Sequence, residues 1–201
     1  MQKQKRKRRS SGSRGKQKGA AHERHVCQRL SLWVSDLTRE DCFWRSAMSG
    51  GRATLKSRKA CKGNGKIKNP AFGAQSGDVT ATHRMGNLLI DLFVVECKFW
   101  KDLEVQRQVF GRPGGKISRF YREVKDIADR SEREPMLIAR QNNQPDLCCT
   151  SKAGWELLKL GAVKKLPVQA IFPRSGMRVM LLRDVLMTNF GRIRKAIRNR
   201  D

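Results

Sequence analysis

Apolar residues recur along the chain with a helical period in several segments. Residues 19–38 carry apolar side chains at i, i+4, i+7, i+8 and i+11, beginning at Val26 and ending at Leu37, which is the spacing of one helix face. Residues 118–134 repeat this pattern, with oppositely charged pairs four residues apart on the outer face. Both segments are predicted to be amphipathic helices. Helices are also predicted over 105–110, 151–160 and 184–200.

Short apolar stretches bounded by turn residues predict the strands, which are 42–47, 77–84, 88–100 and 136–140. Residues 85–87 have turn chemistry, so the second and third strands are expected to form a hairpin. A second hairpin is expected where 168–172 and 177–182 flank a Pro-Arg-Ser-Gly turn. Pro135 is expected to end the helix over 118–134.

The predicted order is helix, three strands, helix and strand, followed by C-terminal elements. Helices that cover both faces of a mixed sheet make an α/β layer architecture. We expect one domain over residues 19–201, with a core at 19–148 and an extension at 149–201 that contains the second hairpin and the last helix.

The net charge of the chain indicates which class of partner it binds. The 201 residues include 44 Lys and Arg against 18 Asp and Glu, which gives a formal charge of +26. Such an excess favours a polyanionic partner, with nucleic acid first and an anionic membrane surface second. No run of 18 apolar residues exists to span a bilayer, and no apolar segment follows the basic start as in a secretory signal.

Two basic segments stand out. Residues 1–18 hold nine Lys or Arg and no acid, and are expected to form a disordered arm that contacts phosphate. Residues 52–76 hold seven Lys or Arg and no acid, and are expected to form a mobile basic loop.

The six cysteines form no C-x-x-C pair. They are expected to be reduced and mostly buried, in a cytoplasmic-type reducing compartment and not in a secreted protein. A structural zinc site is not expected.

The apolar run at 92–100 raises a question, because Glu96 and Lys98 interrupt it on the same face of a strand. One interpretation is an ordinary ion pair at the rim of the sheet. The other adds Asp78, which the predicted hairpin places opposite residue 94 and on the same face as Glu96. Two carboxylates that meet there repel each other, and a divalent cation such as Mg²⁺ relieves the repulsion. Such an ion, with Lys98 beside it, suits phosphodiester hydrolysis.

These residues carry a resemblance. Gly77-Asp78, followed 18 positions later by Glu96-Cys97-Lys98, resembles the PD-(D/E)xK nuclease signature, with Gly in place of the first Pro. Gly19 and Glu23 on the first helix, and the stretch at 45–50, are similar to the archaeal and phage Holliday-junction resolvase branch. The resemblance covers about residues 19–140 and implies a restriction-endonuclease-like core of order α-β-β-β-α-β.

The resemblance also implies roles. Asp78 and Glu96 would hold Mg²⁺ or Mn²⁺, Glu23 would complete the metal site directly or through a water, and Lys98 would assist the nucleophile. Glu23 is equally explained by a preference of acids for helix N-termini. The residues expected to contact nucleic acid are Arg45, Ser46, Ser49, Arg52, Lys56, Arg58 and Lys59. The two serines also suit plain turn positions. A two-fold dimer is expected from the same resemblance.

The predicted function is therefore a Mg²⁺-dependent endonuclease that cuts branched or structured DNA. Two alternatives stay open. One is a non-catalytic nucleic-acid-binding protein, which gains if Asp78 and Glu96 point to opposite faces of the sheet. The other is a restriction-type, sequence-specific nuclease on the same fold.

Overall fold

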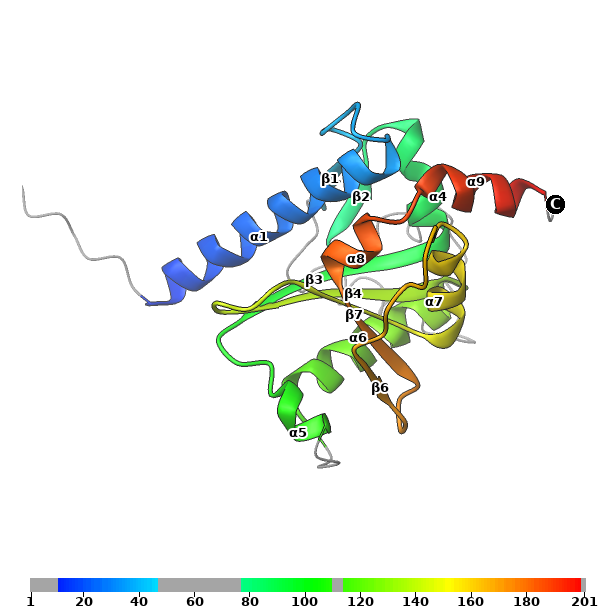
Figure 1. Ribbon diagram of the computed structural model, residues 1–201. Coiled ribbons are helices and arrows are strands. Elements are labelled where there is room, and N and C mark those ends of the chain that lie inside the picture. Colours follow the sequence, from blue (N-terminus) through cyan, green and yellow to red (C-terminus); the bar gives the residue numbers. More distant parts are fainter. Residues whose placement is uncertain (1–10, 47–76, 110–113, 200–201) are drawn as a thin grey trace, which may run out of the picture.

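The computed structural model describes residues 11–46, 77–109 and 114–199. Its centre is a five-stranded sheet of order β3-β4-β5-β7-β6, in which β3 and β4 are parallel and the other neighbours antiparallel (Figure 1). The strands are β3 (Phe93–Trp100), β4 (Glu134–Gln141), β5 (Leu147–Thr150), β6 (Ala170–Phe172) and β7 (Met177–Leu181). A separate antiparallel pair joins β1 (Phe43–Arg45) to β2 (Val79–Ala81).

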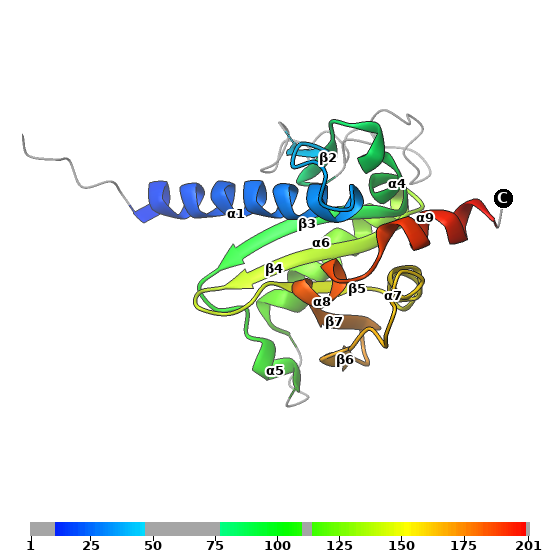
Figure 2. The same ribbon diagram turned by 45° about the horizontal axis from the view of Figure 1, so that its top comes forward.

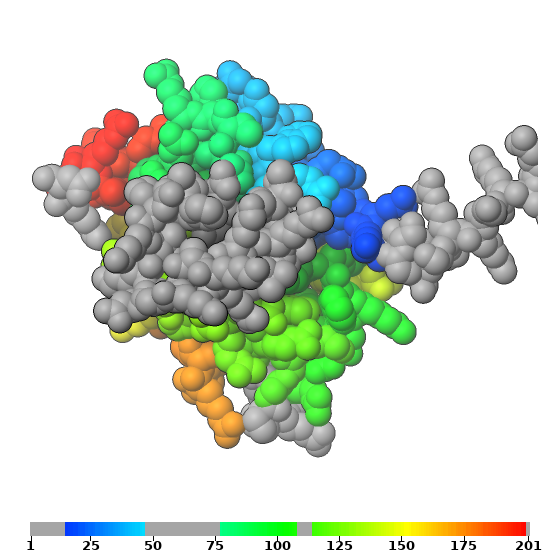
Figure 3. Space-filling model, turned by 180° about the vertical axis from the view of Figure 1, so that it is seen from behind, coloured from blue at the N-terminus to red at the C-terminus, as the bar shows by residue number. Residues whose placement is uncertain are grey.

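Helices cover both faces of the sheet, as the predicted α/β class requires. One face carries the long helix α1 (Ser11–Val34), which Figure 2 shows running alongside β3. The helices α4 (Arg84–Leu92), α7 (Lys152–Lys159), α8 (Leu182–Leu186) and α9 (Phe190–Arg198) complete the core on this face. The opposite face packs on α6 (Lys116–Arg130), which follows the short α5 (Val105–Val109). From behind, α6 and the β6–β7 hairpin occupy the lower part of the molecule and α4 the upper part (Figure 3).

Alternation along the strands divides the buried residues between two cores. Val95 and Cys97 of β3 face the α1 side, whereas Val94 faces α6. Ile138 and Leu137 of β4 divide in the same way. Because neighbouring strand residues point to opposite faces, the near-continuous apolar runs of β3 and β4 are those of strands buried on both sides.

The first helix begins earlier and ends earlier than predicted. It spans Ser11–Val34, so residues 11–18 are helical and not part of a disordered arm, while residues 1–10 lie outside the described chain. Residues 11–18 are polar and include two glycines, which are poor helix formers, so helix propensity does not explain this extension. At the other end, Asp36 and Leu37 adopt positive φ angles of 50° and 66°, which stop the helix and leave Leu37 78% exposed.

The predicted hairpin of 77–84 with 88–100 is wrong. Residues 84–92 form helix α4, and β2 pairs with β1 instead of β3. The ring Nδ1 of His83 caps α4 by accepting a hydrogen bond from Met85 N at 3.3 Å. Gly86, taken for a turn residue, lies inside the helix where it meets the Phe43 ring, and an added Cβ there would come within 2.6 Å of Phe43 Cε1.

Helix α6 also ends before its predicted boundary. It ends at Arg130 with Ser131 as its C-cap, and Glu132 follows with a positive φ of 55°. Pro135 therefore does not terminate the helix but is the second residue of β4. A proline is tolerated at the start of a strand, and Thr150 Oγ1 donates to the Pro135 carbonyl oxygen at 2.6 Å.

The C-terminal residues share the central sheet. The hairpin prediction is confirmed, because β6 and β7 pair around residues 173–176, and α7 begins after its N-cap Ser151 as expected. Strand β5 was not predicted, and it joins β4 to β7. The last predicted helix is divided into α8 and α9, where Asn189 caps α9 by accepting from Arg192 N at 2.9 Å.

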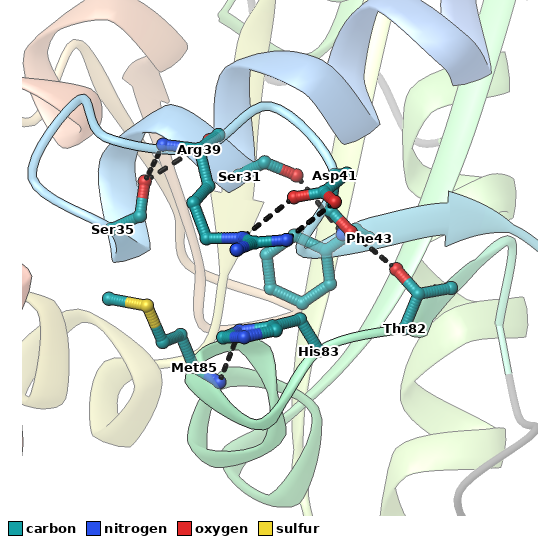
Figure 4. Close-up of polar contacts among 8 residues, drawn as sticks. All are labelled: Ser31, Ser35, Arg39, Asp41, Phe43, Thr82, His83 and Met85. Atoms are coloured by element: carbon teal, nitrogen blue, oxygen red, sulfur yellow. Dashed lines mark hydrogen bonds and ion pairs between the residues drawn. The ribbon is translucent and has the colours of Figure 1, made fainter.

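A polar network fixes the link between α1 and the β1–β2 pair (Figure 4). Arg39 binds Asp41 through two hydrogen bonds of 2.9 and 2.7 Å. The Asp41 carbonyl oxygen accepts from Thr82 Oγ1 at 2.6 Å, and Ser31 Oγ of α1 accepts from Phe43 N at 3.0 Å. These contacts hold β1 and β2 against α1, and so they set the approach of Asp78 and Arg45 to the sheet.

Candidate active site

Asp78 lies along the free edge of β3, just before β2 begins. Its backbone N donates to the Val95 carbonyl oxygen at 2.9 Å, and its Oδ2 accepts from Cys97 N at 3.0 Å. The Asp78 carboxylate thus accepts the hydrogen bond that a backbone carbonyl oxygen of a neighbouring strand would otherwise accept. Asp78 is 5% exposed, so these bonds fix a nearly buried carboxylate beside the middle of β3.

Gly77 makes this approach possible. It has a φ of 102°, and a Cβ at this position would come within 2.5 Å of the Val95 carbonyl oxygen. Proline holds φ near −65°, so it cannot adopt this conformation. The glycine that replaces the signature proline is therefore required by the local backbone.

Lys98 joins the two carboxylates that the sequence singled out. Its Nζ forms a close ion pair with Glu96 Oε1 and lies 3.8 Å from Asp78 Oδ2. Asp78 and Glu96 therefore lie on the same side of β3, beside one amine. The predicted meeting of these three side chains is present, although the edge of β3 produces it and the predicted hairpin does not.

The site raises the proton affinity of Glu96. Burial, and then the charge of Asp78, raise the pKa of Glu96 to about 8, while Lys98 opposes the rise. Burial alone would lower the pKa of Lys98, but Glu96 and Asp78 outweigh it and raise that pKa. Ionising Glu96 and Asp78 together is therefore unfavourable unless more positive charge is supplied.

Glu23 lies on α1 and is bound by Arg45 of β1. Arg45 donates to Glu23 Oε2 through Nε, and its Nη2 lies 2.9 Å from the same oxygen. Ser46 N donates to the Asp78 carbonyl oxygen at 2.8 Å, so the backbone after β1 supports the acid. Glu23 is also close enough to contribute, after burial, to the raised pKa of the Cys27 and Cys97 thiols.

The donor set suits a divalent cation held by two carboxylates. Across the described ranges, no three His, Cys, Asp or Glu residues converge as a metal-binding group. Mg²⁺ binds through one or two carboxylates and fills its remaining positions with water and phosphate oxygens. The crowded pair of Asp78 and Glu96 fits that requirement.

Of the residues predicted to contact nucleic acid, two lie within the described chain. Arg45 and Ser46 lie beside the acids. The others fall outside the described residues, and these are Ser49, Arg52, Lys56, Arg58 and Lys59. The basic loop at 52–76 also lies outside them.

The cysteines of the described segments are free and buried, as predicted. Burial raises the pKa of the Cys148 thiol to about 12, so this group stays protonated and apolar in character. No helix in the described parts of the chain is long and apolar enough to cross a membrane.

Sequence reasoning did not identify the contact between Glu23 and Arg45. The spacing of one helix and one short strand carries no signal for a pair 22 residues apart. The role of Gly77 had a signal, because a Ser-Gly step before an acid indicates a turn with unusual φ.

The comparison with protein families gives one match, to a family described as "Phage putative PDDEXK endonuclease", over residues 14–198. No curated protein and no solved structure matches the chain. The family match extends through the C-terminal strands and helices, beyond the region that the sequence motifs cover.

Proposed function

The chain belongs to this phage PD-(D/E)xK endonuclease family, and we propose that it hydrolyses DNA phosphodiester bonds with a divalent cation, Mg²⁺ or Mn²⁺, held by Asp78 and Glu96. One observation carries the proposal. The nearly buried Asp78 carboxylate and the half-buried Glu96 carboxylate lie beside the same lysine amine at the free edge of β3. This arrangement favours an enzyme over a binding protein, which has no need of a crowded acid pair.

The side chains have separate tasks in this proposal. The cation, when bound, supplies Lewis acidity that polarises the phosphate and lowers the pKa of water. Asp78 is held rigid by Cys97 N, so its free energy of reorganisation on binding is small. With Asp78 and Glu96 holding the cation, Lys98 would donate to the attacking water or stabilise the developing phosphorane charge.

Glu23 and Arg45 act around this centre. The ion pair orients the Arg45 guanidinium beside the acids, where a forked donor suits a phosphate oxygen. Glu23 is therefore proposed to position Arg45, and its action on the metal is through a water at most. Ser46 holds Asp78 through its backbone.

The proposed substrate is DNA of branched or other unusual structure. The formal charge of +26 supports strong phosphate binding, which carries no base sequence by itself. Such binding suits recognition by shape. A two-fold dimer accompanies this proposal, because a four-way junction offers two strands to be cut.

The test is metal-dependent cleavage by the full chain and by two variants, Glu96→Gln and Asp78→Asn. We expect cutting of labelled DNA with Mg²⁺ or Mn²⁺ and none in EDTA. Each variant should lose roughly 10²–10⁴-fold in rate, because each removes a group that acts on the transition-state charge. Glu156→Gln, in an exposed ion pair on α7, should cut like the wild type.

The choice of substrate needs four parallel assays, with duplex DNA, single-stranded DNA, a four-way junction and the same sequences as RNA. Preferential cutting of the junction supports the proposed substrate. Cutting of one duplex sequence alone indicates a restriction-type nuclease. Binding without cutting of any substrate, by a folded chain with metal present, would refute the hydrolase.

A further inference from the structure

A second basic site lies outside the candidate active site, where α1, the β4–β5 turn and α8 meet. It is a pocket of about 280 Å³, and we call it the Asp146 pocket. The residues that line it and enter the argument are Arg29, Arg140, Arg183 and Asp146.

Asp146 organises this pocket. Its Oδ2 accepts from Arg29 Nη1 at 2.7 Å, and its Oδ1 lies 3.2 Å from His22 Nε2. Its carbonyl oxygen accepts from Leu182 N at 2.9 Å, at the start of α8. Burial alone would raise the pKa of Asp146, but the His22 hydrogen bond and the charges of Arg140 and Arg29 lower it, so this carboxylate is ionised.

A purely structural role explains Asp146, His22 and Arg29, because together they tie α1 to the β4–β5 turn. It does not explain the other two arginines. Arg140 Nη1 is 3.8 Å from Asp146 Oδ1, and the Arg140 side chain stays 40% exposed. Arg183 is 71% exposed and lies 3.6 Å from Asp184. Even with both acids counted, the three arginines leave one positive charge that these carboxylates do not balance.

The geometry of Arg140 suits an oxyanion. Its guanidinium lies over the Phe99 ring at 5.8 Å from the centroid, which limits the orientations of the fork. A guanidinium presents its N–H groups in a plane, and that geometry matches the oxygens of a phosphate. The pocket therefore combines a planar donor with an uncompensated charge.

The Asp146 pocket is at the same end of the sheet as the active site. Arg140 pairs with Phe99 in the β3–β4 register, and Phe99 directly follows Lys98. Figure 2 shows the carboxyl ends of β3 and β4 beside the N-terminal half of α1. On α1, Glu23 turns to Arg45 while His22 turns to Asp146, so adjacent residues of this helix contact both regions.

We propose that the Asp146 pocket binds a backbone phosphate of the nucleic-acid substrate, distinct from the phosphate that is cut. The inference rests on the proposed function, because the same nucleic acid enters both sites. Binding at both sites orients the backbone and presents one bond to Asp78 and Glu96. The pocket thereby adds affinity and orientation without reading a base.

Binding to fluorescently labelled DNA in EDTA, at a series of salt concentrations, tests the pocket without catalysis. Arg140→Gln with Arg183→Gln should weaken binding of every sequence alike and reduce the slope of log K against log salt by about 1. Arg140→Lys keeps the charge and should keep most of the slope. Arg174→Gln removes an exposed arginine from the turn between β6 and β7 and should bind like the wild type.

Variants at the active site and at the Asp146 pocket distinguish the proposed hydrolase from the proposed phosphate-binding pocket. Glu96→Gln should bind DNA normally and not cut it, whereas the double arginine variant should bind DNA more weakly and still cut it when metal is present. Wild-type affinity and salt slope in the folded double variant would overturn the pocket, whatever the cleavage result.

A small phosphorylated ligand is the other source of the same chemistry. Calorimetry with inorganic phosphate and with a mononucleotide, on the wild type and on the double variant, separates the two. Binding that the double variant loses, together with unchanged DNA affinity, would assign the pocket to a small ligand and refute a role in holding DNA.

Discussion

At the scale of single residues, Glu96 depends most on its surroundings. It is an acid inside an apolar strand, beside a second acid, and its pKa is raised to about 8 by burial and by Asp78. Lys98 compensates only one of the two charges. The protein therefore retains an unfavourable group at its candidate active site, where a bound cation would make it favourable.

The raised pKa of Glu96 predicts how the stability of the metal-free protein depends on pH. The folded protein binds the Glu96 proton more tightly than the unfolded chain, whose acid titrates near pH 4.5. Between pH 4.5 and 8 the folded state holds more protons, so the free energy of unfolding falls as pH rises, by up to about 1.4 kcal/mol per pH unit from this group. Glu96→Gln should remove that fall and unfold at higher denaturant concentration at pH 8.5.

Urea denaturation in EDTA at several values between pH 5 and pH 9 measures the effect. Glu156→Gln, in its exposed pair with Lys159, provides the control and should follow the wild-type profile. Identical pH profiles for Glu96→Gln and wild type would show that Glu96 is not held in a protonated state.

Gly77 allows a second prediction at this scale. In Gly77→Ala the added Cβ meets the Val95 carbonyl oxygen at 2.5 Å, and the residue keeps a φ of 102°. The strain should cost more than about 2 kcal/mol of unfolding free energy, and the shift of Asp78 should abolish cleavage. Gly176→Ala is matched, since its φ is 65° but nothing lies within 4 Å of the new Cβ, and it should cost about 1 kcal/mol and cut normally. Equal stability of the two variants would contradict the close approach.

At the scale of elements, the contact between α4 and β1 can be tested through a glycine. In Gly86→Ala the new methyl carbon comes within 2.6 Å of the Phe43 ring and 2.9 Å of the Cys42 carbonyl oxygen, so α4 must move away from β1. Helix propensity alone would favour alanine by up to about 1 kcal/mol, and Gly19→Ala on α1 has open space and should show that gain. We expect opposite shifts of the thermal midpoint. A stabilised Gly86→Ala would contradict the packing.

The helix α4 also shows why secondary structure could not be predicted correctly from the sequence in this region. Leu88 to Leu92 and the strand after them form one apolar run, and periodicity does not separate a buried helix from a buried strand in so short a run. Strand β5 was missed for the opposite reason, because four residues after a polar turn carry too little pattern. The long helices α1 and α6 and the β6–β7 hairpin were identified because their apolar faces or turn residues persist over many positions.

At the scale of the whole molecule, the acids of the candidate site were found although their predicted connection was wrong. Asp78, Glu96 and Lys98 were singled out because charge inside an apolar strand needs an explanation, and the three side chains do meet. The pairing of Glu23 with Arg45, and the arginines around Asp146, depend on contacts between elements distant in sequence, which no local pattern encodes. Their catalytic and binding roles stay predictions.

The two cores make the C-terminal strands necessary to the whole sheet. Met180 and Leu182 pack on the α1 side, and Met177 and Val179 pack on the α6 side. A chain that ends at residue 165 loses all of them and exposes an edge of β5. We expect no cooperative thermal transition from this fragment, measured by circular dichroism. A fragment that melts cooperatively near the wild-type midpoint would make the C-terminal region an addition to an independent core.

Two point variants give the same test in the full chain. Val185 on α8 is fully buried in the core that α1 closes, so Val185→Ala should lower the free energy of unfolding by about 2 kcal/mol through lost contacts and a residual cavity. Met187, two residues later, is 82% exposed, and Met187→Ala should change it by less than about 0.5 kcal/mol. Because α1 also carries Glu23, loosening its contact with α8 should disturb Arg45 and the acids near it. We therefore expect Val185→Ala, but not Met187→Ala, to lose cleavage activity at temperatures below its own unfolding midpoint. If each variant instead loses activity only at the temperature at which it unfolds, this coupling is contradicted.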